Sequence, residues 1–383
     1  MLFAMVLAST LLQGTQPASS SLTTTVVDAI DRNYLYAEAA AWQRLRASLL
    51  ADTTATVSSL DRQLASLRDG DLRIVTSTQM KTMQAETAGK ERGIGLVDFA
   101  VAVEPSTGEP TVVTPLVDSP AFKAGLRPGD VILNLDERTT RGMIHEDVMA
   151  MLRGDSGTLK LTIRREGKQI SMDVPMETWD EQAVVSRDVL AGEQHIGYIG
   201  VRLFTPDSGD QVRKAVESLA THDVRKCIID LRNNPGGYLD AMAVAGSAFT
   251  DQTLGWKIRR DDTREAIHAA AKPYQRMRLV VLVNGGTASA AEILAAALRD
   301  TTGAQLVGAR THGRGQIQTY VALNESGGIV IPVANAVSPR GLRFNKGSAL
   351  SPDVVVSSTG DKATVDAVLQ RAVQLLTHGL NGT

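Results

Sequence analysis

The chain has 383 residues, of which 43% are hydrophobic and 21% charged, and this composition is typical of a folded globular protein. Its formal net charge of −2 and the lack of a basic run argue against nucleic-acid binding. The single cysteine, Cys227, excludes an intrachain disulfide and lies in an apolar run, so we interpret it as a buried structural thiol. Because one hydrophobic core rarely exceeds about 300 residues, we expect two or three domains.

Residues 1–20 contain an apolar run, from Leu2 to Leu12, that is short for a membrane span and is followed by small polar residues. This order is typical of an export signal that is either cleaved or kept as a tether. The basic start and the A-x-A cleavage site of such signals are missing, so a first buried helix is the alternative. We expect no other segment to cross a membrane.

Three regions with different patterns follow. Apolar residues recur at helical spacing over 22–68, starting at Val26, Val27 and Ile30, and the pair Asp69–Gly70 is expected to end this region. Residues 93–176 carry short β-like runs at 112–113, 131–133 and 159–163, and one helix at 145–152. Residues 195–357 alternate strands with helices, which predicts a parallel sheet with crossover helices.

In this third region we expect strands at 196–199, 227–231 and 279–283, and helices at 207–219, from about 239, and at 287–298. An amphipathic helix at 363–376 is expected to end the chain.

Ser289 lies where a buried strand runs through the turn Asn284-Gly285-Gly286 into a helix. A hydroxyl at a helix N-terminus lies beside backbone N–H groups that have no partner inside the helix, and acyl transfer needs a nucleophile with such donors. The spacing from Ser289 to Glu292 also fits a capping box, in which both side chains only satisfy helix-end N–H groups. This segment alone leaves both interpretations open.

Two further segments combine glycine with polar or charged residues. In the segment 230–237, two glycines follow a buried strand, so backbone N–H groups there are able to approach a substrate closely. In the segment 308–318, Arg314 lies between two glycines and Gln318 follows four residues later, the order of a base and the group that orients it. Taken alone, the first is an ordinary turn and the second a solvated hairpin.

Together and in this order, the three segments resemble the C-terminal processing (tail-specific) serine peptidases, and the resemblance covers most of residues 70–357. It implies an α/β (α+β) multidomain protein with a crotonase/Clp-protease-like β/α peptidase core, an inserted β-rich PDZ-like domain and an N-terminal helical segment. The implied division is 21–75 for the helical region, 93–176 for the PDZ-like domain, 77–92 with 177–357 for the core, and 358–383 for the C-terminal helix.

The resemblance also implies roles for single residues. Ser289 is the expected nucleophile, Arg314 occupies the position of the general base, and Gln318 is the residue that holds the base. The oxyanion hole is expected from backbone N–H groups of Gly236, Gly237 and Ala290. The implied substrate is a protein or peptide with an unstructured C-terminus, and no cofactor or metal is implied.

Arg314 departs from the family pattern, because the family uses a serine–lysine dyad and arginine stays protonated up to a pH of about 12. One explanation is that another residue accepts the proton of Ser289, and the candidates are His312 and Lys346. Another is that Arg314 itself serves as an unusual base, at a reduced rate. Alternatively, the protein is a catalytically impaired pseudoprotease that binds peptides and regulates a partner. A small-ligand binder on the same fold is a third class.

The loop Gly93, Ile94, Gly95 and Leu96 resembles the carboxylate-binding loop of a PDZ domain, and residues 117–130 match that domain further. Consecutive backbone N–H groups near glycines form a nest for a chain-terminal carboxylate. The resemblance implies that this module recruits C-terminal tails by β-augmentation and gates the catalytic groove. A regulatory or adaptor protein is a further expected partner, the oligomeric state is open, and the apolar N-terminus predicts an extracytoplasmic location, periplasmic or secreted.

Overall fold

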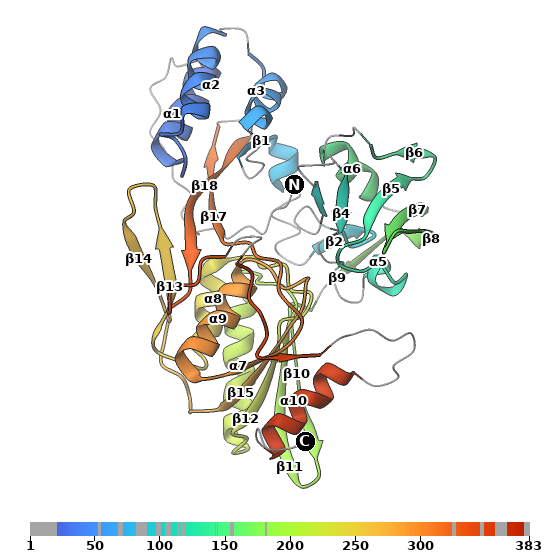
Figure 1. Cartoon of the computed structure of the whole chain (residues 1–383), viewed down its shortest axis with the longest axis vertical. Coiled ribbons are helices and arrows are strands. Elements are labelled where there is room, and N and C mark those ends of the chain that lie inside the picture. Colours follow the sequence, from blue (N-terminus) through green and yellow to red (C-terminus); the bar gives the residue numbers. More distant parts are fainter. Residues whose placement is uncertain are drawn as a thin grey trace.

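The computed structural model describes residues 21–52, 55–67, 72–81, 90–96, 101–103, 109–112, 115, 119–141, 143, 145–153, 157–180, 182–323, 327–344, 348–356 and 366–378. The expected export signal, the pair Asp69–Gly70 and Lys346 lie outside these residues. Figure 1 shows a helical part at the top, a small β-rich part at the right and a larger α/β part below. No helix in the described ranges has both the length and the hydrophobicity needed to span a membrane.

The largest part is a six-stranded sheet in the order β10-β11-β12-β15-β16-β19. Its strands are β10 (Val184–Ala191), β11 (Gln194–Val201), β12 (Lys226–Asp230), β15 (Arg278–Val283), β16 (Gln305–Gly308) and β19 (Val354–Val355). The strands from β11 to β19 are parallel, which confirms the predicted parallel sheet. β10, which was not predicted, pairs antiparallel with β11 at one edge.

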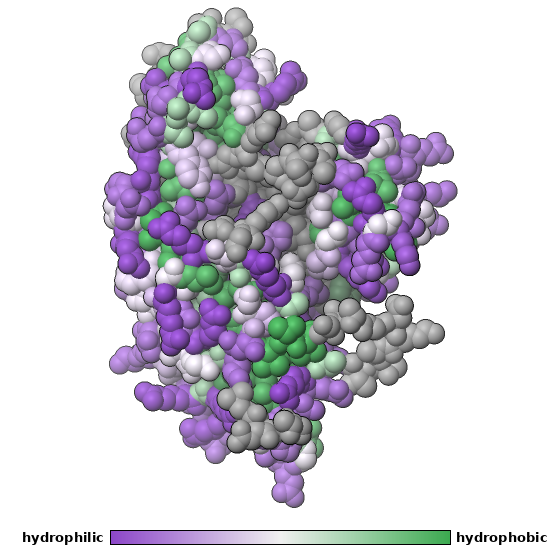
Figure 2. Space-filling view, in the orientation of Figure 1, coloured by the Kyte–Doolittle hydropathy of each residue, from purple (hydrophilic) through white to green (hydrophobic). Residues whose placement is uncertain are grey.

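Helices cover both faces of this sheet (Figure 1). α7 (Ser208–Thr221), α8 (Leu239–Gly246) and α9 (Ala290–Thr302) share one hydrophobic core, and α10 (Ala367–His378) packs on the opposite face. Successive strand residues point to opposite faces, so Cys227 and Ile229 join the first core and Ile228 joins the α10 cluster. Cys227 is fully buried, as predicted. Figure 2 shows a hydrophobic patch low on the visible face, over the part of the molecule that contains β10 and α10 in Figure 1. Val355 of β19 is 73% exposed.

A second, antiparallel sheet has the order β1-β18-β13-β14, with β17 also paired to β18. Its strands are β1 (Arg73–Val75), β13 (Thr253–Ile258), β14 (Arg264–His268), β17 (Gln316–Ala322) and β18 (Gly328–Val337). Ile329 and Ile331 of β18 pack against the N-terminal helices, whereas Ala334 and Ala336 join the core that contains α9. β18 therefore connects two hydrophobic cores.

The predicted N-terminal helical region is divided into α1 (Leu22–Asn33), α2 (Ala40–Ala51), α3 (Val57–Leu64) and the 3₁₀ turn η1 (Ala65–Leu67). The predicted face of Val26, Val27 and Ile30 is buried. α1 ends because Tyr34 adopts an extended backbone, although its N–H still donates to the Ile30 carbonyl. The turn that follows α1 lies against β18, where the Leu35 N–H donates to the Pro332 carbonyl at 2.8 Å.

The β-rich part contains a sheet in the order β3-β4-β5-β7-β8, with β6 paired to β5, and a separate pair of β2 with β9. Its strands are β2 (Lys90–Gly93), β3 (Val101–Val103), β4 (Pro110–Val112), β5 (Val131–Leu135), β6 (Arg138–Thr139), β7 (Thr158–Arg165), β8 (Lys168–Pro175) and β9 (Glu177–Asp180). Its helices are α5 (Pro120–Lys123) and α6 (His145–Leu152), and α6 has the predicted bounds. Short strands joined by Gly/Pro turns thus form the predicted β-rich module.

Candidate active site

Two turns at the carboxyl ends of β12 and β15 are joined by hydrogen bonds. The Asn233 N–H donates to Asn284 Oδ1 at 2.9 Å, and Asn284 Nδ2 donates back to Asn233 Oδ1 at 2.8 Å. The Thr287 hydroxyl donates to the Leu231 carbonyl at 2.8 Å. Because these strands are adjacent and parallel, their carboxyl ends meet at one edge of the sheet, and the two-glycine turn and the Ser289 turn form one unit.

Ser289 immediately precedes α9, which begins at Ala290 and therefore three residues later than predicted. The helix begins later than predicted because the backbone of Ser289 has φ +55° and ψ −120°, which lie outside the helical region. Such a conformation costs a non-glycine residue on the order of 1–3 kcal/mol and persists only where its surroundings enforce it. Ser289 is fully buried.

The two-glycine turn packs directly against Ser289. A Cβ added at Gly236, where φ is +113°, would lie 2.9 Å from Ser289 Cβ and 3.2 Å from the Ala290 nitrogen. The Gly236 N–H itself donates to Asn234 Oδ1 at 2.8 Å, so it is already engaged. No hydrogen bond among the described residues uses the N–H of Gly237 or of Ala290. The oxyanion hole expected from Gly236, Gly237 and Ala290 stays a prediction, and of these three N–H groups that of Gly236 already has a partner.

Glu292 connects the Ser289 turn to the loop that carries Arg314. Its carboxylate accepts hydrogen bonds from the backbone N–H groups of Ser289 (3.0 Å), Gly313 (2.8 Å) and Arg314 (2.8 Å). The Thr311 hydroxyl also donates to it, at 2.5 Å. The sequence indicated only the bond between Glu292 and the Ser289 N–H, which belongs to the capping box. The other three bonds join residues 19–22 positions apart and leave no local signal.

Burial raises the pKa of Glu292 from 4.5 to about 7, although all four hydrogen bonds lower it. The folded protein therefore holds a proton on Glu292 at pH values where the unfolded chain has lost it. The stability that this group contributes is fully present below about pH 4.5 and is lost as the pH rises through about 7.

In Glu292→Gln we expect this part of the pH dependence to disappear. Between about pH 5 and pH 8 the free energy of unfolding of the wild type should fall relative to the variant by up to about 3 kcal/mol. Urea denaturation of both proteins across this range measures the difference. Glu265→Gln is the control, because ion pairs with Lys257 and Arg259 lower the pKa of Glu265 and place its titration below this window. Parallel profiles for wild type and Glu292→Gln would contradict the expectation.

The loop with Arg314 runs beside the Ser289 turn. The His312 N–H donates to the Thr287 carbonyl at 3.0 Å, and both His312 and Arg314 are half-buried. Gln318 lies on β17 and is fully buried, and its side-chain oxygen and nitrogen have no hydrogen-bond partner within the described part of the chain. A register shift between Ile317 and Gln318 interrupts the pairing with β18 at this point.

The charged residues of the two-glycine segment serve a different purpose. Asp230 accepts hydrogen bonds from the Tyr198 hydroxyl at 2.9 Å and from the Arg232 guanidinium at 2.5–3.1 Å. Arg232 also pairs with Asp366, at 2.7 and 2.9 Å, just before α10. Burial is the largest single influence on the pKa of Arg232 and lowers it. The ion pairs with Asp230 and Asp366 together outweigh burial and raise the pKa above its ordinary value. The network therefore fixes α10 to the sheet.

The predicted carboxylate-binding loop begins at the end of β2, and its Ile94 carbonyl accepts a hydrogen bond from the Ala121 N–H of α5 at 2.7 Å. The Ile94 N–H donates to the Leu152 carbonyl at 3.3 Å, and the side chains of Ile94 and Leu96 are buried in the core of the β-rich part. Gly93 and Gly95 have φ values of +96° and +82°. A Cβ at Gly93 would lie 2.2 Å from the Leu152 carbonyl oxygen, so the loop requires glycine there. The N–H of Ile94 is thus engaged, and those of Gly95 and Leu96 remain the candidates for a carboxylate.

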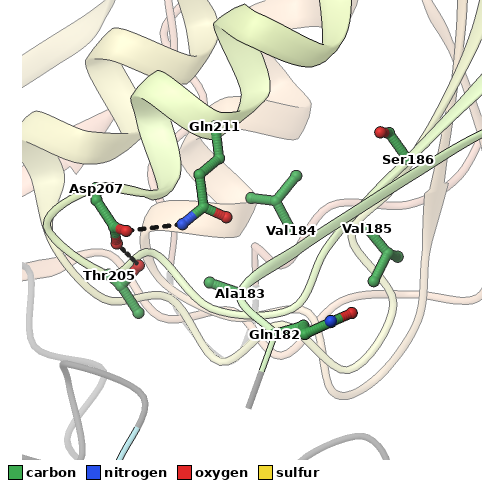
Figure 3. A pocket seen from close by; sticks show the side chains of 8 residues that line it. All are labelled: Gln182, Ala183, Val184, Val185, Ser186, Thr205, Asp207 and Gln211. Carbon is green, nitrogen blue, oxygen red and sulfur yellow. Dashed lines mark hydrogen bonds between the residues drawn. The ribbon is translucent and has the colours of Figure 1, made fainter. Parts of the chain in front are cut away.

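A cavity of about 480 Å³ lies outside this site, between the start of β10 and the start of α7. Figure 3 shows Asp207 there, accepting hydrogen bonds from the Thr205 hydroxyl at 2.8 Å and from Gln211 Nε2 at 2.7 Å. None of the predicted site residues lines this cavity. Within the described ranges, His, Cys, Asp and Glu side chains form no group of three that suits a metal ion.

Comparisons with known proteins match two regions of the chain to family models. Residues 195–356 match the family model of peptidase family S41, and residues 82–164 match that of the PDZ domain. The carboxyl-terminal-processing protease of Synechocystis sp. is 32% identical over 338 residues, covering 85% of this chain and 78% of that protein. The chloroplastic C-terminal processing peptidase of Tetradesmus obliquus is 31% identical over 356 residues, covering 85% and 75%.

Among solved structures, the photosystem II D1 C-terminal processing protease superposes with a TM-score of 0.78 at 27% identity, covering 95% of this chain and 98% of that chain. The fold class and the resemblance expected from the sequence are therefore confirmed.

Proposed function

Because the chain belongs to the carboxyl-terminal-processing proteases of peptidase family S41, we propose that it is a serine endopeptidase that cuts polypeptides near their C-terminal tails, with Ser289 as its nucleophile. One observation carries the proposal. The two-glycine turn, the Ser289 turn and the Arg314 loop meet at the start of α9, where Glu292 and Gly236 both contact Ser289 or its backbone.

In this proposal Ser289 Oγ attacks the scissile carbonyl carbon, and its proton passes to the imidazole of His312. The N–H groups of Gly237 and Ala290 stabilise the oxyanion. The carbon–nitrogen bond then breaks as the proton passes to the leaving amine, and water hydrolyses the acyl-enzyme. Arg314 keeps its charge throughout and stabilises the oxyanion or binds a substrate carboxylate.

The backbone position of His312 supports this residue as the proton acceptor. Its backbone is hydrogen-bonded to Thr287, two residues before Ser289, and imidazole changes its charge near neutral pH. Lys346, the other candidate of the sequence analysis, lies outside the described residues.

The PDZ domain supports a role in substrate recruitment. We propose that the N–H groups of Gly95 and Leu96 bind the terminal carboxylate of an unstructured tail. Since Ser289 is fully buried, substrate entry requires a rearrangement, which tail binding on this domain supplies. The apolar N-terminal run supports an extracytoplasmic location, periplasmic or secreted.

Labelling with a serine-reactive phosphonate tests the proposed nucleophile. The wild type should be labelled and should cut peptides with unstructured tails, whereas Ser289→Ala should lose the label and about three orders of magnitude or more in kcat. Ser186→Ala, which changes an exposed serine on β10, is the matched control and should keep both properties. Labelling that survives in Ser289→Ala would overturn the assignment.

The peptide-binding pseudoprotease remains the alternative that Arg314 raises, but it gains no support from the similar proteins, whose names describe proteases and peptidases. A wild-type protein that binds tails without labelling or cleavage would favour this alternative.

A further inference from the structure

Tyr36, in the segment between α1 and α2, brings an exposed aromatic ring to the strand that follows Arg314. Tyr36 is 41% exposed, whereas Tyr34 in the same segment is 3% exposed. Gln316 Nε2 of β17 donates a hydrogen bond to the Tyr36 hydroxyl at 3.4 Å, across 280 positions of sequence. Gln316 begins β17 two residues after Arg314, so Tyr36 contacts the chain next to the segment that carries Arg314.

The backbone around Tyr36 is held in place from several sides. The Leu35 N–H donates to the carbonyl of Pro332, which is the residue of β18 opposite Gln318. The rings of Tyr34 and Tyr36 meet edge to face, with centroids 5.7 Å apart. Tyr36 is therefore an aromatic surface that is ordered before any ligand arrives, and such a surface binds an apolar side chain with little loss of conformational entropy.

We propose that Tyr36 borders the substrate site and selects a large apolar side chain of the polypeptide substrate. The selected side chain lies within about four residues of the cleaved bond, because an extended peptide advances about 3.3 Å per residue. This inference rests on the proposed peptidase function and assigns part of its specificity to the N-terminal helical region.

Peptides that differ at one position test the proposal. Each peptide keeps the same C-terminal tail, so recruitment by the PDZ domain stays constant, and carries Leu or Gly at one of four positions on either side of the cleaved bond. At one of these positions the wild type should prefer Leu about tenfold in kcat/KM. Tyr36→Ala should reduce that preference to within about twofold.

Two variants separate the ring contact from other effects. Tyr36→Phe keeps the ring and should keep the preference, because the proposal does not depend on the hydroxyl. Tyr274→Ala is the matched control, since Tyr274 is 42% exposed and stacks on Arg213, and it should leave the preference unchanged. Thermal unfolding of Tyr36→Ala verifies that the variant is folded.

Binding of the same peptides to Ser289→Ala and to the double variant Ser289→Ala/Tyr36→Ala distinguishes this proposal from the proposed function. If the wild type cleaves nothing but Ser289→Ala binds the Leu peptide more tightly through Tyr36, the peptidase function fails and the role of Tyr36 stands. The proposal is overturned if the preference for Leu over Gly is the same in proteins with Tyr36 and in proteins with Tyr36→Ala, whether it is measured by cleavage or by binding.

Discussion

Replacing Arg314 with lysine is expected to raise kcat/KM for peptide hydrolysis by about two to four orders of magnitude. The guanidinium cannot release its proton near neutral pH, whereas an amine in a half-buried position is able to become neutral and accept the proton of Ser289. Gln318 is fully buried, with a side-chain oxygen and nitrogen that no described residue engages, so it is available to hold such an amine. Steady-state kinetics on a fluorogenic peptide with a free C-terminal tail measure the change.

Two controls show whether the gain comes from a new base. Arg314→Met removes the charge at similar length without supplying a base and should give no gain. His312→Ala should reduce the activity of the wild type but have little effect in the Arg314→Lys background, because the lysine then accepts the proton. Equal activity of Arg314→Lys and Arg314→Met would show that residue 314 lies away from the proton of Ser289.

Gly236→Ala is expected to lower kcat/KM by about two orders of magnitude or more. The new methyl group would lie 2.9 Å from Ser289 Cβ, and Gly236 has a φ of +113° that an L residue adopts only under strain. A displacement of the nucleophile of about 1 Å is sufficient for a loss of this size. The strained backbone should also lower the free energy of unfolding by about 1–3 kcal/mol. Peptide kinetics and phosphonate labelling measure the loss of activity, and urea denaturation measures the loss of stability.

The neighbouring turn offers a matched control for this substitution. A Cβ at Gly285 would meet only the Arg310 carbonyl oxygen, at 3.9 Å, and Gly285 does not have a positive φ. Gly285→Ala should therefore keep activity within about threefold and stability within about 0.5 kcal/mol. Full activity in Gly236→Ala would mean that the two-glycine turn does not position the reactive hydroxyl.

Elements with a clear local pattern could be predicted from the sequence. α6 has its predicted bounds, and the buried strands β12 and β15 lie within one residue of their predicted positions, because short apolar runs bounded by glycine or polar turns are local signals. The second sheet was missed. In β18, from Gly328 to Val337, both faces pack against other elements, so the alternation that identifies a half-buried strand is absent.

The candidate active site could be predicted only in part. The sequence indicated Ser289, the two-glycine turn and Arg314, because each lies in a segment with its own glycine pattern. It did not show that the Gly236 N–H is engaged by Asn234, although this hydrogen bond joins residues only two positions apart and is a local turn typical of asparagine. A capping box was the only role that the sequence suggested for Glu292, although three of its four hydrogen-bond donors come from the Arg314 loop.

By itself, the sequence determined the order of strands, turns and helices and the chemical nature of the groups in them, because glycine freedom, apolar periodicity and side-chain type are properties of short segments. Only the tertiary structure decided that Ser289, Gly236 and the Arg314 loop share one site, and that Tyr36 reaches β17 from 280 positions away. These contacts depend on which strands become neighbours, and that is set by the packing of whole faces rather than by any single segment.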